Sequence, residues 1–251
     1  MSDSFKVNSE FRKWALGFSG CDGGDIGTPE KSSVWFCGIE WGGGHPANTE
    51  ELLSIWAEDV SAPSPGYKYW NTDLNYIFNW RAAKLLSAID GGCVSAYKHF
   101  AEKVQLFASG NCGYFKMNLY PLAFKNTSHT LWHDAFADAT GFASKQDYLA
   151  WIRANRFPVL KSLGSTHAPK LVVCVGITYR EDFKAAFVDD GVELNCEVID
   201  GRDLYWAKNE NESMVVIIPF MVNHNGLTKD VSIQKFGERI RSLTAAEPAL
   251  G

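Results

Sequence analysis

Long hydrophobic runs and a secretory signal are both missing from this sequence. No apolar run approaches the roughly 20 residues that a membrane-spanning helix needs. Residues 1–6 show no basic region followed by an apolar one, which is the pattern of a signal peptide. We therefore expect a cytoplasmic protein.

Clustered metal ligands are missing as well. The six cysteines include no C-x-x-C pair, the spacing that is typical of zinc ribbons. Residues 19–27 carry Asp22 and Asp25 among glycines, but no glutamate closes an EF-hand loop, so we expect a plain glycine-rich turn. We predict neither a metal nor an organic cofactor, and an iron–sulfur cluster held by dispersed cysteines is the remaining alternative.

Positive charge is scarce, whereas aromatic side chains are plentiful. The chain has 24 Lys and Arg against 29 Asp and Glu, a formal net charge of −5. Because surfaces that bind duplex DNA are usually basic, this balance disfavours tight duplex binding, although it allows a local basic patch. Nine tryptophans indicate either a heavy core or a pocket that stacks planar ligands.

The hydrophobic pattern predicts one α/β domain that covers residues 1–251. Four apolar runs, at 33–40, 114–120, 170–176 and 214–220, have the near-continuous character of strands covered on both faces. Residues 193–208 read as a hairpin added at an edge. Helical periodicity fills the intervals and breaks at Gly141 and Pro158. We predict a three-layer α/β/α sandwich with a central, mostly parallel four-stranded sheet plus an added edge hairpin.

Polar side chains follow three of the four predicted strands. Glu40 ends the first strand, Asn118 lies near the end of the second, and His224 follows the last. The carboxyl ends of parallel strands meet at one edge of a sheet, where α/β proteins bind ligands. A carboxylate there serves as a general base, a carboxamide matches the edge of a nucleobase, and a histidine donates to a developing anion. The alternative for Glu40 is that a charged residue simply ends the strand next to a turn. The alternative for Asn118 is that its side-chain amide hydrogen-bonds to the backbone of a loop.

Three short motifs accompany these side chains. Gly38-Ile39-Glu40-Trp41-Gly42 closes the first strand, Asn118 stands within 115–119, and His224-Asn225-Gly226-Leu227 follows the last strand. In order and spacing, the chain resembles the uracil-DNA glycosylase superfamily, whose first motif is G-x-[DNE]-P-G or G-Q-D-P-Y and whose last is H-P-S-P-L or similar. Trp41 stands in the place of the first motif's proline. The segment that corresponds to the last motif contains neither of the family's two prolines, and one residue fewer separates its histidine from its leucine.

The resemblance extends to an aromatic loop between the first two motifs. Tyr67-Lys68-Tyr69-Trp70-Asn71 is similar to a G-N-x-F-W-like segment in which an aromatic ring stacks on the base. It makes Tyr69 or Trp70 the candidate stacker. Trp41, Gly42 and Gly43 complete the expected binding residues, because glycine N–H groups can face a phosphate or a carboxylate. They do not form the G-x-G-x-x-G fingerprint of dinucleotide sites.

The resemblance implies a divergent glycosylase that cleaves the N-glycosidic bond of a deaminated or modified base in DNA. Glu40 would orient water or stabilise the oxocarbenium-like state, Asn118 would read the base, and His224 would stabilise charge on the departing base. Two alternatives stay open: a non-catalytic module on the same fold that binds a nucleobase, a nucleotide or a protein, and a small-molecule hydrolase with Glu40 as base.

Overall fold

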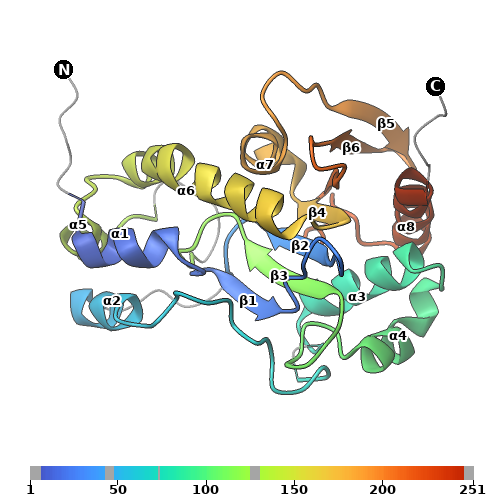
Figure 1. Cartoon of the computed structure of the whole chain (residues 1–251), viewed down its shortest axis with the longest axis horizontal. Coiled ribbons are helices and arrows are strands. Elements are labelled where there is room, and N and C mark those ends of the chain that lie inside the picture. The colour runs from blue at the N-terminus through green and yellow to red at the C-terminus, as the bar shows by residue number, and fades with distance from the viewer. Residues whose placement is uncertain (1–6, 43–47, 73, 125–130, 246–251) are drawn as a thin grey trace.

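The computed structural model describes residues 7–42, 48–72, 74–124 and 131–245, and every strand in them joins one sheet (Figure 1). The sheet has seven strands in the order β1-β3-β2-β4-β7-β6-β5. Their bounds are β1 (Cys21–Gly24), β2 (Val34–Gly38), β3 (Tyr114–Asn118), β4 (Leu171–Val175), β5 (Asn195–Ile199), β6 (Arg202–Lys208) and β7 (Met214–Ile218). The chain is thus an α/β protein with a mixed sheet.

The four strands expected from the apolar runs form the parallel core of this sheet. β3, β2, β4 and β7 lie side by side and pair in parallel, and every residue in them is buried. The register places Gly38 opposite Asn118 and Cys37 opposite Cys174. Strands covered on both faces need apolar side chains at successive positions, which is why these runs were recognisable in the sequence.

Both edges of the sheet are antiparallel, and one of them departs from expectation. The hairpin of β5 and β6 is confirmed and joins the core through β7. Residues 19–27, expected as a plain turn, instead contain β1, which pairs antiparallel with β3 and makes the sheet larger than four strands plus a hairpin. Gly23 has a φ of +102°, and a Cβ there would lie 2.2 Å from the carbonyl oxygen of Ser64. The glycines that suggested a turn are therefore required by close packing against the neighbouring loop.

Helices pack on both faces of the sheet. The face that carries Trp35 and Cys37 is covered by one group of helices, and the face that carries Val34 and Phe36 by another. The first group is α1 (Ser9–Leu16), α2 (Thr49–Trp56), α5 (Asp134–Thr140), α6 (Lys145–His167) and α7 (Arg180–Phe187). The second is α3 (Ile77–Ile89), α4 (Tyr97–Val104) and α8 (Asp230–Ala245). Two short 3-10 turns, η1 (Val94–Ala96) and η2 (Ile177–Tyr179), precede α4 and α7.

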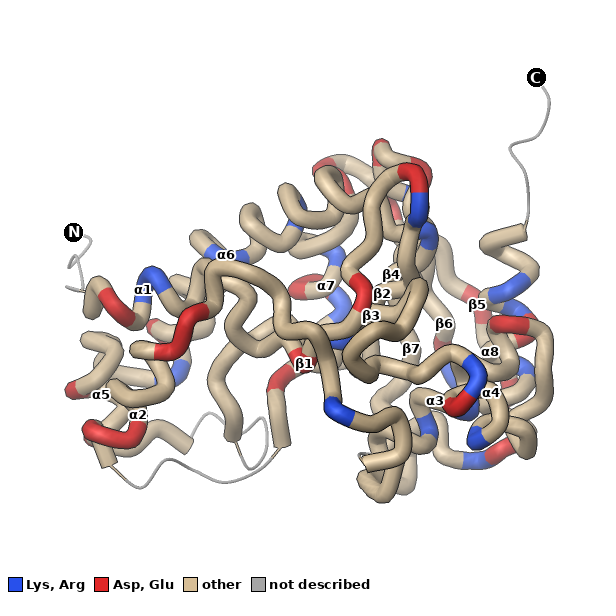
Figure 2. The backbone as a smooth tube through the Cα atoms, turned by 60° about the horizontal axis from the view of Figure 1, so that its bottom comes forward, with Lys and Arg blue, Asp and Glu red and all other residues tan. Residues whose placement is uncertain are grey.

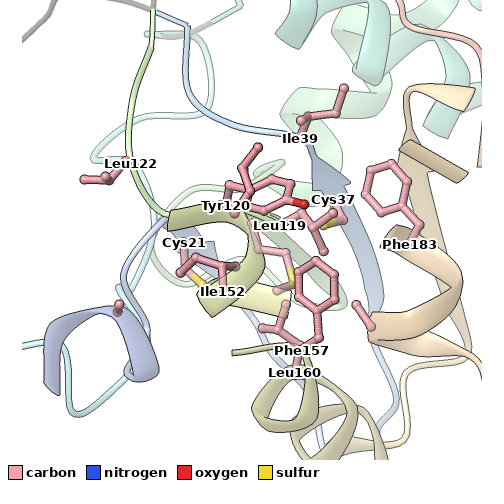
Figure 3. Close-up of a cluster of buried hydrophobic side chains, with 14 of the residues drawn as sticks. Cys21, Cys37, Ile39, Leu119, Tyr120, Leu122, Ile152, Phe157, Leu160 and Phe183 are labelled. Carbon is pink, nitrogen blue, oxygen red and sulfur yellow. The ribbon is translucent and has the colours of Figure 1, made fainter. Parts of the chain in front are cut away.

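The helix α6 is continuous where a break was expected. Pro158 lies inside it and does not open a separate piece. The wholly buried Arg156 lies in the same stretch of α6, and its guanidinium donates to the carbonyl oxygens of Leu119 and Ser19 at 3.3 and 2.6 Å. Figure 3 shows the buried apolar cluster to which Cys37, Ile39, Leu119 and Tyr120 belong. Arg156 therefore fixes the entry to β1 and the exit from β3 against α6.

None of the described helices is both long enough and apolar enough to cross a membrane.

Candidate functional site

The strand order creates a switch point between β2 and β4. In sequence the parallel strands run β2, β3, β4, β7, but β3 lies on one side of β2 while β4 and β7 lie on the other. Connections therefore leave β2 and β4 in opposite directions, and doubly wound sheets bind ligands in the crevice outside the carboxyl ends of such strands. Gly176, directly after β4, has a φ of +131°, and a Cβ there would lie 2.5 Å from Ile39 Cδ1. Only glycine lets the two strand exits approach this closely.

Glu40 lies at this switch point and pairs with a lysine that the sequence did not indicate. Its Oε2 is 3.5 Å from Nζ of Lys145, the first residue of α6. The side chains of Glu40 and Lys145 are 6% and 0% exposed. The Lys145 ammonium also lies 3.6 Å from the ring centroid of Phe124, an attractive cation–π contact. Two charges are thus held out of water between β2, α6 and the segment after β3.

The environment of Glu40 favours its protonated form more than water does. Burial raises the pKa of the Glu40 carboxyl to about 7, although the neighbouring Lys145 lowers it. Burial likewise lowers the pKa of Lys145, against the opposing effect of Glu40. The second carboxylate oxygen, Oε1, is buried and has no hydrogen-bond partner among the residues that the structure describes. A buried acceptor without a partner is rare and marks a place for a water molecule or a ligand, and a pKa near neutrality suits a general base.

Asn118 is held one strand away, on β3. Its backbone N–H and its Nδ2 donate to the carbonyl oxygen of Gly20, at 2.9 and 3.1 Å. The side chain therefore satisfies a loop carbonyl, which was the structural alternative for this residue. Its Oδ1 faces Gly38, where an added Cβ would lie 2.5 Å away. The ring of Phe78 at the start of α3 packs at the same place, 3.7 Å from that Cβ position, and it is an aromatic neighbour that sequence reasoning missed.

His224 is exposed in the loop after β7, with β4 between β7 and β2. Two arginines hold this loop from either side. Arg81 of α3 donates to the carbonyl oxygen of Met221 at 2.5 Å, and Arg202 of β6 donates to that of Gly226 at 2.9 Å. Leu227 is wholly buried in the core, so its side chain does not project from the loop. The structure thus places His224 at the same edge of the sheet as Glu40, in an ordered but solvent-facing position.

The aromatic candidates divide between the site and the core. Trp41 follows Glu40 directly and is 39% exposed. Tyr69 is 56% exposed, with the Lys68 ammonium 5.2 Å from its ring centroid. Trp70 is half-buried against the core and, with Tyr67 and Leu74, lines a small apolar hollow. Gly42 is exposed, bridges Phe124 in parallel, and leaves open space around a Cβ position, whereas Gly43 lies outside the described residues.

The structure therefore brings together Glu40, Trp41 and Gly42, sets Asn118 beside the preceding Gly38, and leaves Trp70 in the core. Lys145 had one sequence signal, because Ser144 caps α6 by accepting from the N–H of Asp147 at 3.1 Å and so places Lys145 at a helix start. That signal predicts the position of Lys145 at the helix start but does not predict that it pairs with Glu40.

In the part of the chain that the structure describes, no three His, Cys, Asp or Glu side chains gather as a metal site. Models of known protein families find no match to this chain, and a search of curated proteins finds no significantly similar sequence.

Proposed function

We propose that this protein is a divergent uracil-DNA glycosylase-like enzyme that hydrolyses the N-glycosidic bond of a deaminated or modified base, on a three-layer α/β/α domain. The observation that carries this proposal is the unpartnered, buried Oε1 of Glu40 beside Lys145 at the switch point of the sheet. A carboxyl group whose pKa is about 7 exchanges a proton readily near neutral pH. The resemblance in the strand-end motifs and the helices on both faces of the sheet support the same assignment.

In this scheme Glu40 accepts a proton from a water molecule bound at Oε1. The oxygen of that water forms the new bond to C1′ of the sugar while the bond from C1′ to the base nitrogen breaks. The base leaves with the bonding electron pair and later takes up a proton, and Glu40 holds the proton from water. Lys145 stabilises the carboxylate that must be present at the start, and the negative charge of Glu40 stabilises positive charge that develops on the sugar.

Asn118 and His224 would recognise the base and its departing charge. One N–H of Asn118 Nδ2 is engaged with Gly20, which leaves the second N–H and the acceptor Oδ1 for a base. Such a donor and acceptor pair matches the N–H and carbonyl edge of uracil or hypoxanthine. His224, exposed at the same sheet edge, would donate to the base as negative charge appears on it.

The test is incubation of the protein with single- and double-stranded oligonucleotides that carry one uracil, hypoxanthine or xanthine. We expect abasic product from at least one of them, and loss of that product in Glu40→Gln. Glu212→Gln is the matched control, because Glu212 forms a surface ion pair with Lys208 at 2.8 Å. No abasic product from any substrate, or equal cleavage by Glu40→Gln, would refute the proposal.

A non-catalytic nucleobase- or nucleotide-binding module is the second candidate, and a specific observation favours it. In Figure 2 the Asp and Glu positions are interspersed with the Lys and Arg positions along the described chain, and the formal net charge is −5, a balance that disfavours tight binding to a DNA backbone. Titration separates the two functions. Affinity for DNA that falls steeply with salt supports the enzyme, and binding of a free nucleobase without turnover supports the module.

A further inference from the structure

A second group of polar side chains, distinct from the Glu40–Lys145 pair, also involves Trp41. Asp22 of β1 accepts from the Tyr67 hydroxyl through Oδ1 at 2.7 Å, and its Oδ2 lies 3.2 Å from Nζ of Lys116. Lys116 also donates to the Tyr67 hydroxyl oxygen at 2.7 Å. The indole Nε1 of Trp41 donates to Oδ2 of Asp22 at 3.3 Å. We call these four residues the Asp22 cluster.

The Asp22 cluster is well shielded except at one member. The side chains of Lys116 and Asp22 are 9% and 13% exposed, whereas Trp41 is 39% exposed. Its members come from β1, β3, the loop before α3 and the segment after β2, so only the tertiary fold assembles them. A shielded ion pair that is fully hydrogen-bonded fixes its neighbours in one geometry. Here the neighbour that faces solvent is the indole.

Trp41 is held at both its main chain and its side chain. Its carbonyl oxygen accepts from the backbone N–H of Phe124 at 3.1 Å, and its indole is tied to Asp22. The residue directly before it is Glu40. A broad aromatic face with few rotamers left to lose is thus fixed beside the reactive carboxylate, and such preorganised faces bind flat rings with little entropic cost.

We propose that Asp22 is a positioning residue that holds the Trp41 indole as the stacking platform for a planar heteroaromatic base. This rests on the proposed function and deepens it: Trp41, and not Tyr69 or Trp70, becomes the residue against which the base lies. Lys116 and Tyr67 act through Asp22 by fixing its two oxygens. The ring of the ligand contacts Trp41, and Asp22 contacts the indole but not the ligand.

The experiment measures binding in a Glu40→Gln background, so that no turnover interferes. The probe is a single-stranded oligonucleotide with one uracil. It is titrated against the Glu40→Gln protein, which serves as the parent, and against the same protein carrying Asp22→Asn, Trp41→Phe or both. We expect Asp22→Asn to weaken binding on the order of tenfold, the scale of one aromatic stacking contact. Because Asp22 acts through the indole N–H, which phenylalanine lacks, Asp22→Asn should add no further loss in the Trp41→Phe background.

A matched control comes from a second tyrosine–aspartate–cation group. Asp182 accepts from the Tyr120 hydroxyl at 2.6 Å and from Arg153 at 2.7 and 2.9 Å, and its side chain is 14% exposed. The described hydrogen-bond partners of Asp182 are Tyr120 and Arg153, and Trp41 is not among them. Asp182→Asn should change stability much as Asp22→Asn does and leave oligonucleotide binding unchanged. A direct readout of the indole is its 1H–15N resonance, which Asp22→Asn should shift and Asp182→Asn should not.

Each possible result supports or overturns the positioning role of Asp22, the proposed function, or both. Binding by Asp22→Asn within about twofold of the parent, or equal weakening by Asp182→Asn, overturns the positioning role. Additive losses in the double variant overturn the route through Trp41. Binding without any cleavage by the wild-type protein contradicts the proposed function alone, because the positioning role is read from binding and from the indole resonance. No binding by the parent overturns both.

Discussion

Trp41 adjoins two lysine–carboxylate pairs, one through the hydrogen bond of its indole to Asp22 and the other through its sequence neighbour Glu40, and the two pairs differ in their hydrogen bonds. Asp22 receives hydrogen bonds from Tyr67 and Trp41 as well as its contact with Lys116. Within the described part of the chain, the partner of Glu40 is Lys145, at 3.5 Å, and the other carboxylate oxygen of Glu40 has no hydrogen-bond partner. A buried charge whose hydrogen bonds are all made holds its surroundings rigidly, whereas one that lacks them is ready to bind water or a proton. In the function that we propose, the first pair therefore positions the Trp41 indole, and the second pair supplies the general base.

The largest expected effect separates the two carboxylates by activity. Glu40→Gln should lower base release about 10²- to 10⁴-fold, the usual contribution of a general base. Asp22→Asn should cost far less, because it weakens only the stacking of the base. Rates of abasic-site formation at saturating and at limiting oligonucleotide measure the difference. A larger loss of rate in Asp22→Asn than in Glu40→Gln would reverse the roles assigned to the pairs.

The next effect separates the two lysines by stability. Lys116→Met leaves Asp22 as a shielded charge without its cation and should cost about 3–5 kcal/mol of unfolding free energy. Lys145→Met should cost less at pH 6, because Glu40 can take up a proton and shed its charge. Urea denaturation of both variants at pH 6 measures this. Equal losses in the two variants would contradict it.

Stability should also depend on pH through Glu40. Its pKa is about 7 in the folded chain against 4.5 for the free group, so between these values only the folded state keeps the proton. The free energy of unfolding should therefore fall as pH rises from 4.5 to 7, by about 3 kcal/mol, and this contribution should stay constant on either side. Glu40→Gln should remove this decline. Lys145→Met, which removes the stabilising cation, should extend it above pH 7.

The smallest effect concerns Gly38 at the end of β2, two residues before Glu40. Gly38→Ala brings a Cβ to 2.5 Å from Oδ1 of Asn118, so the amide must move, at a cost of about 1–3 kcal/mol. Gly42→Ala is the control, because nothing lies within 4 Å of its Cβ position. Thermal unfolding compares the two variants. A Gly42→Ala variant as unstable as Gly38→Ala would refute the packing at the end of β2.

The sequence was most informative where burial alone sets the structure. The four core strands could be predicted because strands covered on both faces leave continuous apolar runs. β1 could not, since Cys21–Gly24 has no apolar pattern and becomes a strand only by pairing with β3. Pro158 shows the same limit inside α6, where tertiary packing overrides a local helix breaker.

The site was predictable at its strand ends and not beyond them. Glu40 could be singled out because a carboxylate followed a buried strand. Lys145 and Asp22 could not, because each reaches its partner through the fold: Lys145 is 105 positions from Glu40 and Asp22 is 19 from Trp41. Sequence spacing likewise gave no means to prefer Trp41 over Tyr69 as the stacking residue, since that preference rests on the hydrogen bond between the Trp41 indole and Asp22, which only the fold creates.

The ionisation of Glu40 tests the central claim most directly. The chemical shift of its side-chain carboxyl carbon, followed by NMR in protein labelled with 13C-glutamate and assigned by comparison with Glu40→Gln, gives the pKa without any substrate. The structure predicts a midpoint of about 7, displaced upward in Lys145→Met. A midpoint near 4.5, the ordinary value for a glutamate, would show that Glu40 is a solvated strand-end charge and would contradict its role as the general base.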